Sequence, residues 1–93
     1  MIAHLFSIYD VKAMVFHAPF LAHNDADAMR MVSVQIGKPE TMYARFPEDY
    51  RLMYCGQWND NSGVIDPETP RFVCEVYSLL AEGAKGYNNE EDD

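Results

Sequence analysis

The chain has 93 residues, 48% of them hydrophobic, and a formal net charge of −8 at pH 7. This length allows one domain with a small core, because a chain of this size buries only about two-thirds of its unfolded surface. The N-terminus lacks a basic region, and no apolar run approaches the ~20 residues of a membrane span, so we expect neither a secretory signal nor a transmembrane segment.

The first half of the chain predicts two extended segments followed by one long helix. Residues 2–9 are short, apolar and rich in β-branched and aromatic side chains, which is typical of a buried strand. Residues 13–20 are a second extended candidate, which Pro19 restricts to a sheet edge or a strand end. Asn24 is a good helix N-cap, and the main helix should run from about residue 24 to 36. Gly37 is placed to end it in a left-handed conformation.

The middle of the chain predicts one short helical turn and then a long aromatic strand. Residues 41–46 form the turn, and Pro47 ends it. Residues 50–58 form the strand, in which every second residue should face the core. The residues at these even positions are Tyr50, Leu52, Tyr54, Gly56 and Trp58.

The last part of the chain predicts a hairpin and a final element of uncertain type. Residues 59–63 are typical of a hairpin connection, in which Gly63 supplies a positive φ. Val64 and Ile65 start a fourth strand, and Thr69-Pro70 marks another bend. Residues 71–80 fit both a strand and a helix, because β-branched residues come first and Leu79 and Leu80 follow.

These elements predict an α+β domain over residues 1–81, in which a mostly antiparallel sheet of four to five strands packs against one main helix. Residues 82–93 carry four net negative charges and should form a flexible, disordered acidic tail. Such a tail could occupy a basic groove until a DNA strand displaces it, recruit a basic partner, or only improve solubility. Cys55 and Cys74 are too few for a disulfide framework, and we expect a reduced pair, with a single disulfide as the alternative.

No signature of a catalytic or metal site stands in the sequence. His17 and His23 form no His-x-x-x-His pair and no Cys-x-x-Cys is present, so no zinc geometry is encoded locally. Neither cysteine sits in a nucleophile motif with a partnered histidine, and there is no Gly-rich phosphate loop. The run at residues 59–63 does not fit the register of a calcium loop. We therefore expect a binding protein that is not an enzyme and uses no metal or cofactor.

Aromatic and cationic side chains interleave in the middle of the chain, and this pattern is typical of sites that hold single-stranded nucleic acid. The candidate nucleic-acid-binding residues are Lys12, Tyr43, Arg45, Phe46, Tyr50, Arg51, Tyr54, Trp58 and Arg71. Two observations oppose this hypothesis. The strand aromatics alternate as a core face does, and the acidic charge of the chain repels phosphate.

Met31 and Val34 fall outside the apolar stripe of the predicted helix. They are either scattered surface residues or a second contact face for a partner or a second copy of the chain. The second interpretation predicts a protein–protein adaptor or host modulator that acts as a homodimer, without binding nucleic acid.

Several short segments, in a fixed order, resemble the small nonstructural protein of gokushoviruses, which are single-stranded DNA phages of the microvirus group. The resemblance covers about residues 5–80 and rests on Phe6-Ser7-Ile8-Tyr9-Asp10 with Lys12, Pro19-Phe20, Ala28-x-Arg30, Pro39-x-Thr41, Pro47-Glu48-Asp49-Tyr50-x-Leu52, Gly56-x-Trp58 and Thr69-Pro70.

The resemblance implies a phage accessory protein that is absent from the virion shell and acts in the host cytoplasm. It implies a role in genome replication or packaging, with phage or host replication and packaging proteins as partners and no membrane association. A third hypothesis is a capsid-assembly helper, whose acidic chain shields basic DNA-packaging peptides.

Overall fold

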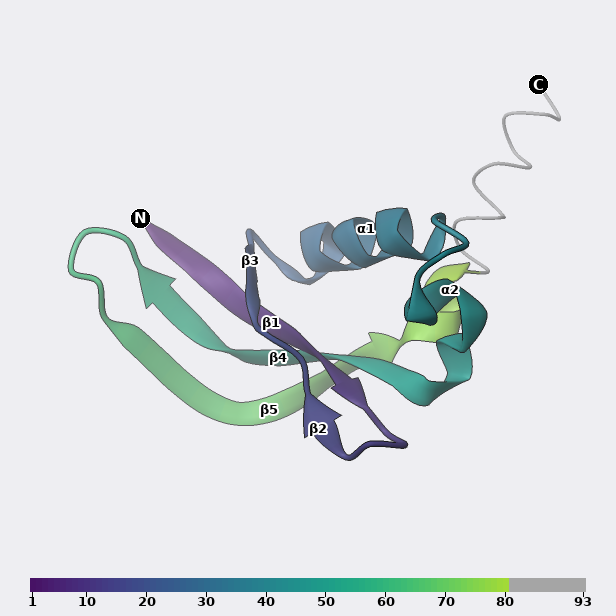
Figure 1. Ribbon diagram of the computed structural model, residues 1–93. Coiled ribbons are helices and arrows are strands. Elements are labelled where there is room, and N and C mark those ends of the chain that lie inside the picture. Colours follow the sequence, from purple (N-terminus) through teal and green to yellow (C-terminus); the bar gives the residue numbers. More distant parts are fainter. Residues whose placement is uncertain (81–93) are drawn as a thin grey trace, which may run out of the picture.

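The computed structural model describes residues 1–80, and it is an α+β fold built on one antiparallel sheet (Figure 1). Its elements in chain order are β1 (Ile2–Asp10), β2 (Val15–Phe16), β3 (Phe20–Ala22), α1 (Asp25–Ile36), α2 (Met42–Arg45), the 3-10 turn η1 (Pro47–Asp49), β4 (Tyr50–Asn59) and β5 (Ile65–Glu75). The predicted fold class, with its antiparallel sheet and one main helix, is confirmed. The predicted acidic tail over residues 82–93 lies outside the described residues.

Strand β1 lies inside the sheet, where β4 pairs along one side of it and β2 and β3 pair along the other. Strand β5 follows on the outer side of β4. The single extended segment predicted for residues 13–20 is therefore split into two short strands, because residues 11–14 form a turn and Pro19 lies in the gap. As predicted, Pro19 lies at the edge of the sheet, where its missing N–H costs no ladder hydrogen bond.

Helix α1 covers one face of the sheet and supplies one side of the core (Figure 1). Ala28, Val32 and Ile36 are buried at spacing i, i+4, i+8, so they form one stripe along the helix. They pack against buried residues of the strands and of the helical residues 76–80, namely Phe6, Ile8, Tyr50, Leu52, Tyr54, Val76 and Leu79. Burying each large side chain contributes about 1.5–3 kcal/mol.

The predicted N-terminal cap of α1 is confirmed, whereas the predicted conformation at its C-terminal end is wrong. Asn24 caps the N-terminus as predicted, because its side-chain oxygen accepts a 2.8 Å hydrogen bond from the backbone N–H of Asp27. The left-handed conformation predicted for Gly37 is wrong, since its φ of −67° is right-handed. The Thr41 hydroxyl lies 3.0 Å from the carbonyl of Gln35 and 2.9 Å from that of Lys38. These contacts satisfy carbonyls that a left-handed glycine cap would otherwise serve.

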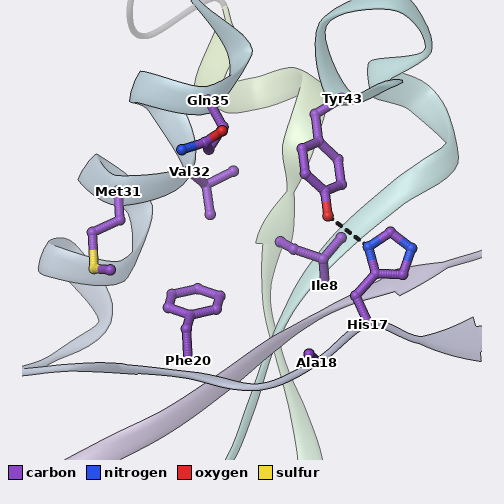
Figure 2. Close-up of a pocket in the computed structure, with 8 residues that line it drawn as sticks. All are labelled: Ile8, His17, Ala18, Phe20, Met31, Val32, Gln35 and Tyr43. Atoms are coloured by element: carbon purple, nitrogen blue, oxygen red, sulfur yellow. Dashed lines mark hydrogen bonds between the residues drawn. The ribbon is translucent and has the colours of Figure 1, made fainter. Parts of the chain in front are cut away.

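The predicted turn at residues 41–46 is present as α2, and it is tied to the edge of the sheet. Thr41 caps α2 by accepting a hydrogen bond from the Ala44 N–H. The Tyr43 hydroxyl and His17 Nδ1 are hydrogen-bonded at 2.5 Å (Figure 2). The Tyr43 ring also meets the edge of the Tyr50 ring, with centroids 4.9 Å apart. This aromatic contact fixes α2 over the start of β4.

A β-bulge interrupts β4 and reverses the faces of its last residues. The register with β1 shifts there, so that Phe6 lies opposite Tyr54 while Leu5 lies opposite Gly56, which leaves Cys55 as the extra residue. One extra residue exchanges the two faces of a strand from that point on. The predicted core alternation therefore holds for Tyr50, Leu52 and Tyr54, but it is wrong for Trp58, which lies on the other face.

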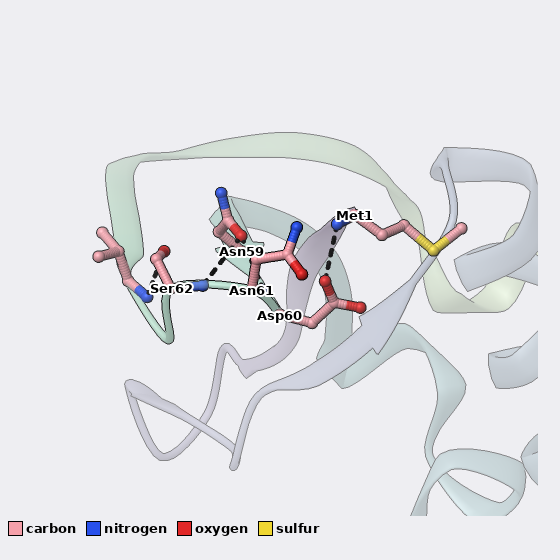
Figure 3. Close-up of polar contacts among 6 residues, drawn as sticks. Met1, Asn59, Asp60, Asn61 and Ser62 are labelled. Carbon is pink, nitrogen blue, oxygen red and sulfur yellow. Dashed lines mark hydrogen bonds and ion pairs between the residues drawn. The ribbon is translucent and has the colours of Figure 1, made fainter.

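The hairpin connection between β4 and β5 lies one residue later than predicted, since β4 ends at Asn59 and β5 begins at Ile65, and it contains the predicted glycine. Gly63 has a φ of +76°, and its N–H donates to the Asn59 carbonyl at 2.8 Å. The Asn59 side chain accepts from the N–H groups of Asn61 and Ser62, and the N-terminal ammonium of Met1 pairs with Asp60 at 2.7 Å (Figure 3). The tip is thus held by its own polar side chains.

Strand β5 answers two questions that the sequence left open, namely the bend at Thr69-Pro70 and the choice between strand and helix for residues 71–80. The predicted bend at Thr69-Pro70 is not a strand end but an irregularity inside β5, because Gly56 pairs with Pro67 while Tyr54 pairs with Arg71. The ambiguous residues 71–80 contain both elements, since the strand ends at Glu75 and residues 76–80 are helical. Cys55 and Cys74 are present as free thiols.

Candidate binding face of the sheet

The face of the sheet opposite α1 carries no helix within residues 1–80 (Figure 1). Residues directly opposite each other on paired strands share one face, so the register identifies the side chains on it. We call this surface the open face. Its larger members are Leu5, Tyr9, Phe16, Leu21, Arg51, Met53, Trp58, Ile65, Phe72 and Glu75, and Ala3, Ser7 and Pro67 lie among them.

One row of the open face joins aromatic rings to a cation across four strands. Phe16 lies opposite Tyr9, Tyr9 opposite Arg51, and Arg51 opposite Glu75. The ring centroids of Tyr9 and Phe16 are 4.7 Å apart. Arg51 Nε lies 2.9 Å from Glu75 Oε1, which makes the charged part of the row neutral.

The other rows of the open face are apolar apart from the buried Ser7, which lies opposite Met53. Met53 lies opposite Phe72, Leu5 opposite Leu21, and Trp58 opposite Ile65. Phe16 is 43% exposed and Phe72 is 52% exposed, while Met53 and Trp58 are half-buried. The open face therefore presents four aromatic residues on one surface, with Arg51 as the cation among its members.

The structure separates the predicted nucleic-acid-binding residues into several groups. Tyr50 and Tyr54 are only 5% and 6% exposed and belong to the core, so their prediction as base-stacking residues is wrong. The even positions before the bulge face α1, and a small domain needs such large rings inside. Arg51 and Trp58 are on the open face, although in different rows.

Arg71 and the other predicted residues lie away from the open face. Arg71 forms two 3.1 Å hydrogen bonds to the Asp25 carboxylate, and its guanidinium lies over the Tyr54 ring at 4.6 Å on the α1 side of the sheet. Tyr43 is half-buried beside His17. The remaining three are exposed, Lys12 in the turn after β1 and Arg45 and Phe46 at the end of α2.

Met31 and Val34, the predicted partner-binding residues, are 40% and 58% exposed on α1. Neither residue is covered by the rest of residues 1–80, so the hypothesis of a second contact surface on the helix remains a prediction.

Burial changes the acidity of several groups on both faces. Burial, together with the nearby Asp10, raises the pKa of Tyr50, and burial raises the pKa of Tyr43. Burial also raises the pKa of the Cys55 thiol. These hydroxyls and this thiol are therefore protonated at neutral pH, and Cys55 lacks the thiolate character of a nucleophile.

Sequence reasoning missed Tyr9, Phe16, Leu21 and Phe72 as members of the site. Their side chains come together only through the pairing of β1 with β2, β3 and β4 and of β4 with β5. One signal was available, because a glycine inside a strand pattern, such as Gly56, suggests a bulge that moves later residues to the other face.

Among residues 1–80, no three histidine, cysteine or acidic side chains are grouped so that they could hold a metal ion. No helix in that part of the chain is long and apolar enough to cross a membrane.

A family model described as Phage ORF5 protein matches residues 3–79. The match covers most of the chain, so the chain belongs to the Phage ORF5 protein family and is a phage-related small protein. No curated protein matches the chain. No solved structure matches it.

Proposed function

We propose that this phage protein is a non-enzymatic accessory factor that binds single-stranded DNA on the open face of its sheet. The observation that carries the proposal is the row formed by Phe16, Tyr9 and Arg51, in which two rings lie beside a guanidinium on a sheet face that no helix of residues 1–80 covers. Proteins that hold single strands combine such aromatic platforms with cationic side chains.

The resemblance to gokushovirus nonstructural proteins supports the same function, because those phages carry single-stranded DNA genomes. We propose that binding assists replication or packaging of such a genome in the host cytoplasm, outside the virion shell. Phage or host replication and packaging proteins would be the partners in this process.

The charge of the open face predicts that base stacking contributes more to binding than attraction of phosphate does. Each stacked base contributes about 1–3 kcal/mol, whereas every phosphate contact on a single strand adds only about −0.7 to the slope of log K against log salt concentration. Arg51 is paired with Glu75, so few phosphates can be neutralised. We therefore expect binding that depends on stacking and weakens only slightly with salt.

Fluorescence anisotropy with a labelled oligothymidine at low and moderate salt tests the proposal. Phe16→Ala should weaken binding about 5- to 150-fold, which corresponds to the loss of one stacked base. Phe46→Ala is the matched control, because Phe46 has the same 43% exposure as Phe16 but lies outside the open face. The proposal is wrong if the wild-type protein does not bind at low salt, or if both variants lose the same affinity.

A second candidate function is a protein–protein adaptor that uses the open face to form a homodimer. The observation that favours it is the apolar character of the rows around Met53, Phe72 and Ile65, because an exposed apolar sheet face is a common interaction surface. Sedimentation velocity at several concentrations tests this function. Phe72→Glu should convert a dimer to a monomer, and a wild-type protein that stays monomeric at all concentrations would exclude the homodimer.

A further inference from the structure

A cavity of about 260 Å³ lies on the other side of the same sheet edge, between α1, β1 and the segment that joins β2 to β3 (Figure 2). Its walls are mainly apolar, with Ile8 and Phe20 on the sheet side and Met31 and Val32 on the helix side. A cavity of 150 Å³ with apolar walls holds benzene, so this one has room for a substituted ring or a fused pair of rings.

Polar groups stand at one end of the cavity. The hydrogen-bonded pair of His17 and Tyr43 forms part of the wall, and the Gln35 amide lies at the helix side near Tyr43 (Figure 2). Burial raises the pKa of Tyr43, so its hydroxyl stays protonated and can donate or accept a hydrogen bond at neutral pH. An occupant that is apolar over most of its surface and carries hydrogen-bonding groups along one edge would match these walls.

The chain places this cavity beside the open face. Phe16 lies on the open face and its neighbour His17 lines the cavity, so consecutive residues of the edge segment serve the two sites. A strand that stacks on Phe16 and passes over this edge reaches the cavity next. Ala18, which also lines the cavity, is small and exposed, and it leaves the approach from the edge open.

We infer that the cavity receives one unstacked base of the bound DNA strand. A nucleobase has apolar faces and carries donors and acceptors along its edge, so it fits the apolar walls and the polar end. An aliphatic side chain of a partner protein could fill the apolar part, but unlike a base it could form no hydrogen bond with Gln35, His17 or Tyr43. The inference rests on the proposed function, because single-stranded DNA supplies the base.

Methyl NMR of methionine-labelled protein separates the cavity from the open face. The chain has six methionines, of which Met31 lines the cavity and Met53 lies on the open face. Oligothymidine should shift both methyl signals, and thymidine alone should shift that of Met31. If the oligonucleotide shifts only Met53, the base pocket is refuted and the proposed function stands. If it shifts neither, both are refuted. A shift of the Met31 signal without a shift of the Met53 signal supports the base pocket and refutes the open face as the DNA-binding surface.

A pair of substitutions on α1 gives an independent test by anisotropy. Met31→Trp places a larger side chain against the cavity and should weaken oligothymidine binding about 5- to 150-fold, as expected for the loss of one held base. Val34→Trp is the matched control on the same helix, because Val34 is exposed and does not line the cavity. The inference would be overturned if Met31→Trp and Val34→Trp bound oligothymidine equally well, whether both kept the wild-type affinity or both lost it.

Discussion

Substitution of Gly56 by alanine should be among the most destabilising single changes outside the core, because Gly56 adjoins the bulge at Cys55 that sets the two faces of β4. Gly56 has a φ of +144°, a conformation that residues with a side chain rarely adopt. A Cβ atom at this position would lie 2.4 Å from the carbonyl oxygen of Asp66 and 3.0 Å from the Cα of Pro67. Both contacts are with the backbone of β5, so no side-chain rotation can relieve them.

The expected cost has two parts. Strain at such a φ is of order 1–3 kcal/mol. Displacing the packed backbone of β5 adds about 1–3 kcal/mol, as for other overpacked sites. We expect a loss of about 4 kcal/mol, which is a large fraction of the roughly 5–14 kcal/mol of stability that a domain of this size has.

Urea unfolding measured by the fluorescence of Trp58, the chain's one tryptophan, gives the free energy directly. With a slope of about 1–3 kcal/mol per molar urea, the midpoint should fall by more than about 1 M. Gly37→Ala is the control, because Gly37 is right-handed and its added Cβ would meet the Val34 carbonyl oxygen at 3.3 Å. Its effect should be below about 1 kcal/mol. A loss below about 1 kcal/mol for Gly56→Ala would refute the reasoning on the bulge.

Three further predictions concern the core and its titrating groups. Leu52→Ala should lose about 2–5 kcal/mol in urea unfolding, because Leu52 is fully buried. Since the folded pKa of Tyr50 is raised above its ordinary value of 10.0, its contribution to stability is present below about pH 10 and is lost as pH rises through the folded pKa. Ultraviolet titration with circular dichroism should show this tyrosine ionising together with unfolding. Cys55 should react with iodoacetamide at neutral pH more slowly than a free cysteine, as followed by mass spectrometry, because burial raises its pKa.

Elements that depend on local signals could be predicted from the sequence. The N-cap of Asn24, the short helix that Thr41 starts and the hairpin closed by Gly63 all use hydrogen bonds or backbone preferences within a few residues. The end of α1 at Ile36 was predicted, but the right-handed conformation of Gly37 was not, and the Thr41 hydroxyl that contacts the Gln35 carbonyl comes from beyond the turn. The split of β2 from β3 was not predicted, although Pro19, which lies between them, is a local signal for a strand end.

The candidate site was less predictable than the fold, because it depends on register. A strict alternation from Tyr50 to Trp58 assigns both residues to one face, and the bulge at Cys55 assigns them to opposite faces. Phe16 and Phe72 are far from Arg51 in the sequence and join it only across paired strands. The order of residues in the sequence shows that aromatic and cationic side chains interleave, but it does not show which rings share a surface with which cation.

The bulge also explains how so small a domain carries many aromatic residues without placing all of them inside. Tyr54, before the bulge, completes the core beside Phe6, with ring centroids 5.3 Å apart. Trp58, after it, adds to the open face, where an aromatic cluster that binds nothing would only favour aggregation. Because Glu75 neutralises Arg51, attraction of phosphate cannot be the main reason for keeping those rings exposed. For either proposed occupant, a DNA strand or a second copy of the chain, we therefore expect affinity to come from contact with apolar surfaces and raised salt to change it little.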